Sequence, residues 1–122
     1  MSVPILKQGP YLIASIQSAL SDADLRELRD ALVTQVGRYR SHGVIVDVTA
    51  LDVLDSFATR TLSDSANMIR LRGAHTVIVG IQPDVAFSMA YMGLRLEGVA
   101  TALDLEEGLA HLKALGRVAR GH

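Results

Sequence analysis

The stretch that decides the fold reads Val44-Ile-Val-Asp-Val-Thr-Ala-Leu-Asp-Val-Leu-Asp-Ser-Phe-Ala-Thr-Arg60. Its first residues, 44–48, are β-branched and nearly all apolar, which is typical of a central strand covered on both faces. An acidic loop follows. Beyond it, apolar residues recur at the spacings of one helix face, at Ala58, Leu62, Ala66 and Ile69. The stretch predicts a strand, a loop and a helix that starts at an exposed Ser56.

Two residues compete to cap this helix. Asp55 and Ser56 are both of the types preferred at an N-cap, where a side-chain oxygen accepts a hydrogen bond from the first free backbone amides. The sequence leaves both possibilities open.

Toward the N-terminus, residues 4–7 and 11–16 predict two short strands joined by a Gly-Pro turn, as in an edge hairpin. Ser21 then opens a helix with acidic residues in its first turn. Its apolar stripe is Leu25, Leu28, Leu32, Val36 and Tyr39.

Toward the C-terminus, residues 75–79 predict a second buried strand, and a helix follows from Pro83 to about Met92. Residues 99–103 predict a short strand, and Asp104 caps a last helix through Leu115. Residues 116–122 are expected to be a frayed basic tail. The order β-β-α-β-α-β-α-β-α predicts an α/β fold, with a mixed, mostly parallel sheet packed against about four helices.

The length of 122 residues fits a single domain, 1–122, with a core over about 4–115. The net charge of −1 provides no basic field for nucleic acid and no polybasic membrane anchor. Cysteine is absent, which excludes disulfides and thiolate sites. The N-terminus does not read as a secretory signal, and no apolar run approaches the ~18 residues of a membrane span, so we expect a cytoplasmic protein.

Motifs for catalysis or cofactor binding are missing. The four histidines, His42, His75, His111 and His122, have no metal-ligand spacing. The sequence contains no Gly-x-Ser-x-Gly elbow, dinucleotide fingerprint or phosphate-binding P-loop. We therefore expect no enzymatic activity, no cofactor and no metal.

The acidic group Asp47, Asp52 and Asp55 suggests one alternative, because clustered carboxylates at strand ends hold Mg²⁺ and accept a phosphoryl group in receiver domains. A receiver also needs an acidic pair after its first strand and a late lysine. The only lysines here are Lys7 and Lys113, so an aspartate-phosphorylated receiver is the weaker interpretation.

Ser56 has two interpretations, as a helix cap or as a phosphorylation site. A phosphate at a helix N-terminus is tolerated by the helix dipole, yet it adds about 1.5 to 2 negative charges beside Asp52 and Asp55. Other hydroxyl residues compete as acceptors, although some of them must face the core: Thr59, Thr61, Ser63 and Ser65.

The residues 43–58 resemble the signature of STAS domains, the fold of anti-sigma-factor antagonists. Further blocks occur in the order found in RsbS-type stressosome proteins: Pro4-Ile-Leu-Lys, Ser15-Ile-Gln, Gly80-Ile-Gln-Pro and Thr101-Ala-Leu-Asp-Leu-Glu-Glu-Gly-Leu. The likeness spans about 4–115. Its departure is the run of Ser and Thr after Phe57, which leaves secondary phosphorylation open.

The resemblance implies a non-enzymatic scaffold that retains an RsbT-like serine kinase until it is phosphorylated on Ser56, and that then releases the kinase to a stress-response output. The implied partners are RsbR-like STAS proteins in a large hetero-oligomer and an RsbX-like phosphatase. The implied switch surface is Asp52, Asp55, Ser56, Thr59 and Arg60. RsbR-type proteins carry an extra sensor domain, for which we expect no room here. The alternative is a stand-alone anti-sigma-factor antagonist that binds an anti-sigma kinase.

Overall fold

The structure is a computed structural model that describes residues 3–120. Its strands are β1 (Ile5–Gln8), β2 (Tyr11–Ser15), β3 (Gly43–Asp47), β4 (His75–Val79) and β5 (Ala100–Ala102). Its helices are α1 (Asp22–Tyr39), α2 (Ser56–Leu71), α3 (Pro83–Tyr91) and α4 (Leu105–Arg120). The predicted order of elements and the α/β class are confirmed.

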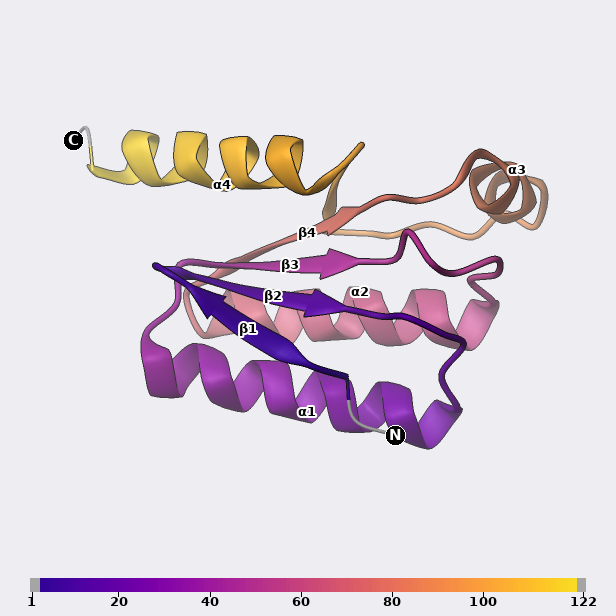
Figure 1. The fold of residues 1–122 in the computed structure, drawn as a ribbon, viewed down its shortest axis with the longest axis horizontal. Coiled ribbons are helices and arrows are strands. Elements are labelled where there is room, and N and C mark those ends of the chain that lie inside the picture. Colours follow the sequence, from indigo (N-terminus) through magenta and orange to yellow (C-terminus); the bar gives the residue numbers. More distant parts are fainter. Residues whose placement is uncertain (1–2, 121–122) are drawn as a thin grey trace.

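The five strands form one sheet in the order β1-β2-β3-β4-β5, in which β1 is antiparallel to β2 and the other pairs are parallel. The helices α1 and α2 each connect a strand to its next parallel neighbour in the same direction. Because such crossovers are right-handed, both helices cover the same face of the sheet. Figure 1 shows α1 and α2 on this face and α4 on the other, while α3 lies beyond the ends of the strands.

Alternating side chains of the strands form a core on each face of the sheet. Val44 and Val46 of β3 belong to the larger cluster, with the apolar stripes of α1 and α2, whereas Ile45 points to the α4 side and packs with Leu112. All three β3 side chains are at most 2% exposed. The strand is therefore covered on both faces, as its apolar sequence predicts.

The ends of α1 and α2 follow from local chemistry. Ser21 and Asp24 form a reciprocal capping box at the start of α1, in which each side chain accepts from the other residue's backbone amide. The helix α2 ends at Leu71, before Gly73, whose φ of 90° favours glycine. The predicted start of α1 and the predicted stop of α2 are both confirmed.

Three predictions of detail need correction. Tyr39 does not extend the buried stripe of α1: it is the last residue of that helix and is 41% exposed, with the Arg38 guanidinium 5.6 Å from its ring centroid. The strand β5 is shorter than predicted. The helix α4 continues past Leu115 to Arg120, because Gly116 weakens a helix by only about 1 kcal/mol and keeps its backbone amide. Residues 121–122 of the predicted tail lie outside the described part.

Within residues 3–120, no helix is both long and apolar enough to cross a membrane.

Candidate functional site

The loop from Val48 to Asp55 leaves the sheet at the end of β3 and leads into α2. Its first turn is held by Asp47, whose Oδ1 accepts hydrogen bonds from the Thr49 backbone amide (2.9 Å) and hydroxyl (2.6 Å). The Val48 amide donates to the carbonyl of Val79 (3.0 Å), and Leu51 donates to Val48 (2.9 Å). The loop is thus tied to the sheet before it turns outward.

The segment between β4 and α3 supports this loop from the side. Gln82 donates from Nε2 to the carbonyl oxygen of Thr49 at 2.8 Å. Gly80 adopts a φ of 82°, and a Cβ at this position would collide with the Thr49 hydroxyl. The Gly80-Ile-Gln-Pro block therefore fits against the loop because its first residue is small and its third carries an amide.

Two buried leucines anchor the middle of the loop, and the two side chains between them are exposed to solvent. Leu51 and Leu54 are 7% and 5% exposed, whereas Asp52 is exposed and Val53 is 70% exposed. The loop consequently exposes Asp52 and Val53 to solvent while the two buried leucines fix its backbone.

Asp55 is the N-cap of α2. Its Oδ1 accepts a hydrogen bond from the Ala58 amide at 2.8 Å, and its backbone is extended, with φ −78° and ψ −179°. Ser56 is the first residue of the helix; it is exposed, and its hydroxyl has no hydrogen-bond partner among residues 3–120. Of the two caps that the sequence allowed, Asp55 performs the role and leaves the Ser56 hydroxyl free.

Ser56 is the only exposed hydroxyl residue on α2. Thr59, Thr61 and Ser65 are 3%, 6% and 5% exposed, and Ser63 is half-buried with its Oγ covered. The Ser65 hydroxyl donates to the Thr61 carbonyl at 2.6 Å. Among the hydroxyl residues of α2, Ser56 is therefore the one that solvent reaches most readily. Thr59, which the resemblance includes in the switch surface, is buried and lines the hollow beside Ser56.

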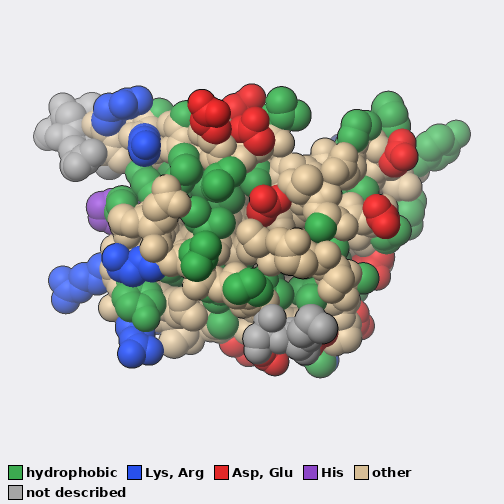
Figure 2. Space-filling model, in the orientation of Figure 1, with side chains coloured by type: hydrophobic (Ala, Val, Ile, Leu, Met, Phe, Trp, Pro, Cys, Tyr) green, Lys and Arg blue, Asp and Glu red, His purple; other side chains and the backbone are tan. Residues whose placement is uncertain are grey.

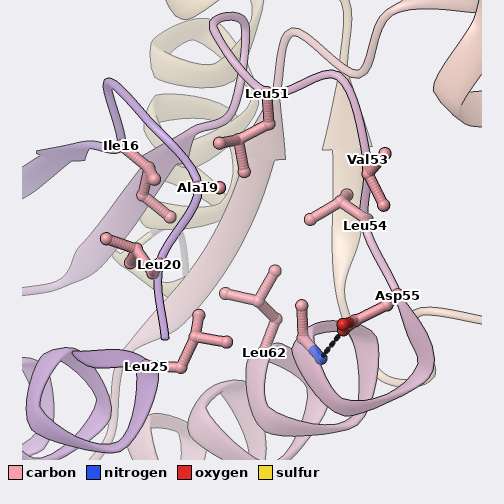
Figure 3. A pocket seen from close by; sticks show the side chains of 10 residues that line it. Ile16, Ala19, Leu20, Leu25, Leu51, Val53, Leu54, Asp55 and Leu62 are labelled. Carbon is pink, nitrogen blue, oxygen red and sulfur yellow. Dashed lines mark hydrogen bonds between the residues drawn. The ribbon is translucent and has the colours of Figure 1, made fainter. Parts of the chain in front are cut away.

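An apolar pocket of about 110 Å³ opens on one side of the α2 start. Figure 3 shows side chains from the β2–α1 segment, the acidic loop and α2 pointing into it, with the Asp55–Ala58 hydrogen bond at its edge. Its lining is Ile16, Ala19, Leu20, Leu25, Leu51, Val53, Leu54, Asp55, Ala58 and Leu62. Ser56 therefore stands beside an open hydrophobic hollow.

A polar hollow of about 350 Å³ lies on the other side of the α2 start. One stripe of α2 lines it, because Ser56, Arg60, Ser63 and Asn67 follow each other at helical spacings of three or four. Arg95 and Glu97 come from the segment after α3. Arg60 is exposed and forms no ion pair within the described residues, so the structure brings it close to Ser56 as a free cation.

The three aspartates of the acidic group have separate roles. Asp47 holds the Thr49 turn, Asp55 caps α2 and Asp52 is exposed. Within residues 3–120, no three His, Asp or Glu side chains group as they do around a metal ion. The sequential strand order also differs from the 2-1-3-4-5 order of receiver domains. This geometry gives the receiver interpretation no support.

Charge is distributed unevenly along the molecule. On the face drawn in Figure 2, Lys and Arg side chains gather at the left end, whereas Asp and Glu side chains lie over the start of α4 and toward the right, where α2 begins. The site around Ser56 thus carries Asp52 and Asp55 at its rim, with Arg60 one helical turn away. Negative charge added to Ser56 therefore lies near the carboxylates of Asp52 and Asp55 and near the guanidinium of Arg60.

Known proteins share both the sequence pattern and the architecture. The model of the STAS domain family matches residues 2–107. A structure of a serine-to-glutamate variant of RsbS from Moorella thermoacetica is 37% identical, with a TM-score of 0.80 over 94% of this chain and 97% of that one. A chain of the stressosome, described as a signal integration and transduction hub, is 36% identical, with a TM-score of 0.74 over 93% of this chain and 99% of that one.

A curated relative is the RsbT co-antagonist protein RsbRA of Bacillus subtilis (strain 168), which is 27% identical over 84 residues, or 69% of this chain. The chain spans only 31% of the length of that relative. The sequence signature around Ser56, the sheet with its helices, and these matches agree: the chain belongs to the STAS domain family and resembles RsbS.

Proposed function

We propose that this protein is a non-enzymatic stressosome scaffold that retains an RsbT-like serine kinase until Ser56 is phosphorylated. The observation that carries the proposal is the position of Ser56. It is the single exposed hydroxyl residue of α2, its neighbour Asp55 performs the capping, and it lies between an apolar pocket and a polar hollow. The similarity to RsbS and to a stressosome chain supports the assignment.

Phosphorylation of Ser56 changes the surface while leaving the fold in place. The hydroxyl makes no hydrogen bond among residues 3–120, so its modification breaks none there. Phosphate at the first position of a helix is stabilised by the free amides and the helix dipole. It still adds about 1.5 to 2 negative charges next to Asp52 and Asp55, so this surface becomes much more acidic without unfolding.

Release of the kinase follows from that charge. A partner that covers Ser56 must remove water from the group at this position. Removing water from a phosphate costs far more free energy than removing it from a hydroxyl. Burial under a partner also strengthens the repulsion between this phosphate and the carboxylates of Asp52 and Asp55. The switch surface in this proposal is Asp52, Asp55, Ser56 and Arg60, with Thr59 beneath it as a buried residue that lines the polar hollow. An RsbX-like phosphatase resets the switch.

The same protein forms a large hetero-oligomer with RsbR-like STAS proteins in this proposal. Apolar side chains on α3 and at its C-cap are suited to such contacts: Phe87, Tyr91 and Met92 are 70%, 95% and 65% exposed. Figure 2 shows hydrophobic side chains gathered over this helix, at the upper right. A helix that projects beyond the sheet with this much apolar surface is typical of an interaction site.

The proposal is tested by incubating the protein with the cognate kinase and ATP and mapping the product by mass spectrometry. We expect one acid-stable phosphoserine, on Ser56, and none in the Ser56→Ala variant. Phosphorylation at another residue, or an acid-labile aspartyl phosphate with small phosphodonors, would contradict it.

A further inference from the structure

A notch opens at the edge of the sheet, far from the start of α2, because β5 is shorter than β4. The strand β5 pairs only with Val77, Ile78 and Val79, so His75 and Thr76 have no partner strand on that side among residues 3–120. The hollow at this place has a volume of about 400 Å³. It lies between the last turns of α2, on one face of the sheet, and α4 on the other (Figure 1).

The ionisable side chains that line the notch are all basic. Arg70 comes from α2, His75 from β4 and His111 from α4. The remaining lining carries no carboxylate: it is Ala66, Asn67, Ala74, Thr76, Gly98, Ala100 and Leu115. The notch also lies at the end of the molecule where Lys and Arg side chains gather (Figure 2). It therefore favours negative charge.

The contacts of His75 agree with a positive environment. Arg70 Nη1 lies 2.7 Å from His75 Nε2, so the guanidinium and the imidazole meet at the mouth of the notch. Partial burial, and then the charges of Arg70 and His111, lower the pKa of His75. An anion between these groups would offset both charges and allow the imidazole to protonate.

We propose that this notch is a binding site for a small oxyanion of the sulfate or phosphate class, held by Arg70, His75 and His111. The phosphoryl group of a small metabolite and free phosphate share this chemistry. The site is separate from Ser56, and its occupancy does not depend on the state of that residue. Binding tightens as pH falls because protonation of His75 adds an N–H donor and a positive charge.

The test uses the unmodified full chain and NMR signals of the two imidazoles. Sulfate is the first probe because its charge is constant from pH 5.5 to 8, at roughly two negative charges. Inorganic phosphate and glycerol 3-phosphate are the second and third, and they distinguish free phosphate from a phosphate ester. Sodium chloride at matched ionic strength is the control for screening.

We expect saturable shifts of His75 and His111 with each oxyanion, and an affinity at least threefold higher at pH 5.5 than at pH 8. Arg70→Gln should weaken sulfate binding at least threefold. Arg26→Gln, which removes one charge near the start of α1, should leave it unchanged. Equal shifts with chloride, or full affinity in Arg70→Gln with the fold intact by circular dichroism, would overturn the proposal.

Discussion

Gln82 and Thr49, 33 positions apart, are joined by a hydrogen bond of 2.8 Å from the Gln82 amide to the Thr49 carbonyl. This bond connects the segment after β4 to the loop that carries Asp52 and Asp55. Gly80 supports the same contact, because its φ of 82° and its lack of a Cβ let the Thr49 hydroxyl approach. The loop that precedes Ser56 thus depends on residues beyond α2.

The Gly80 contact gives a prediction with a matched control. Gly80→Ala and Gly73→Ala both place a Cβ at positive φ, but only the first collides with a neighbour, since nothing lies within 4 Å of the corresponding position at Gly73. Each should lose about 1 kcal/mol of unfolding free energy from the backbone, and Gly80→Ala should lose more. Urea denaturation measures the difference. Equal losses would show that Thr49 moves aside without cost, so that its close approach to Gly80 does not constrain the loop.

The cap of α2 gives a second prediction. Asp55→Ala removes the acceptor of the Ala58 amide, so unfolding free energy should fall by about 0.5 to 2 kcal/mol. Ser56→Ala removes no hydrogen bond within the described residues, so its effect should stay within about 0.5 kcal/mol. If urea denaturation shows Ser56→Ala to be the more destabilising variant, Ser56 is the cap and its hydroxyl is not free.

Stability should depend on pH through His75. Burial and the charges of Arg70 and His111 lower the pKa of His75 below its unfolded value. The unfolded chain therefore binds the proton more tightly, so stability should fall as pH decreases from about 7 through the unfolded pKa of ~6.5. Measurement at pH 7.5 and 5.5 in chloride buffer should show a smaller fall for His75→Gln than for the unmodified protein. An equal fall in both would rule out His75 as the source.

Assembly should depend on the apolar side chains of α3. Replacing Phe87 and Tyr91 with Glu, which puts charge on surface that a partner buries, should abolish large complexes with co-expressed RsbR-like protein. Leu71→Glu is the control, because Leu71 is 89% exposed at the other end of the molecule. Light scattering distinguishes large complexes from dimers. If the α3 variant still assembles, this helix is not the contact; if the unmodified protein never assembles, the stand-alone antagonist is the better account.

Local chemistry made most of the fold predictable from the sequence. Pro83 fixed the start of α3 and Gly93 its end, and the apolar spacing after Phe57 predicted the buried face of α2. The predicted end of α4 before Gly116 was wrong because glycine lowers helix propensity without excluding a helix. The predicted burial of Tyr39 was wrong because helical spacing does not tell how far the sheet extends beneath the last turn of α1.

The candidate site was predictable in part. The sequence indicated an exposed Ser56, yet Asp55 and Ser56 are similarly good caps, and only the extended backbone of Asp55 and its bond to Ala58 separate them. The burial of Thr59 depends on how α2 lies against its neighbours, which local pattern does not determine. The two hollows beside Ser56 are made by segments far apart in the chain, so no sequence motif indicated them.

The central claim is that phosphorylation of Ser56 releases a kinase, and calorimetry tests it most directly. The affinity of the cognate kinase is measured for the unmodified protein, Ser56→Ala, Ser56→Asp and the phosphorylated protein, each checked for folding by circular dichroism. We predict equal affinity for the unmodified and Ala forms and a loss of at least about tenfold, or about 1.4 kcal/mol, on phosphorylation. The Asp form should fall between them, because it carries a single charge. Equal affinity of the folded unmodified and phosphorylated proteins would contradict the account.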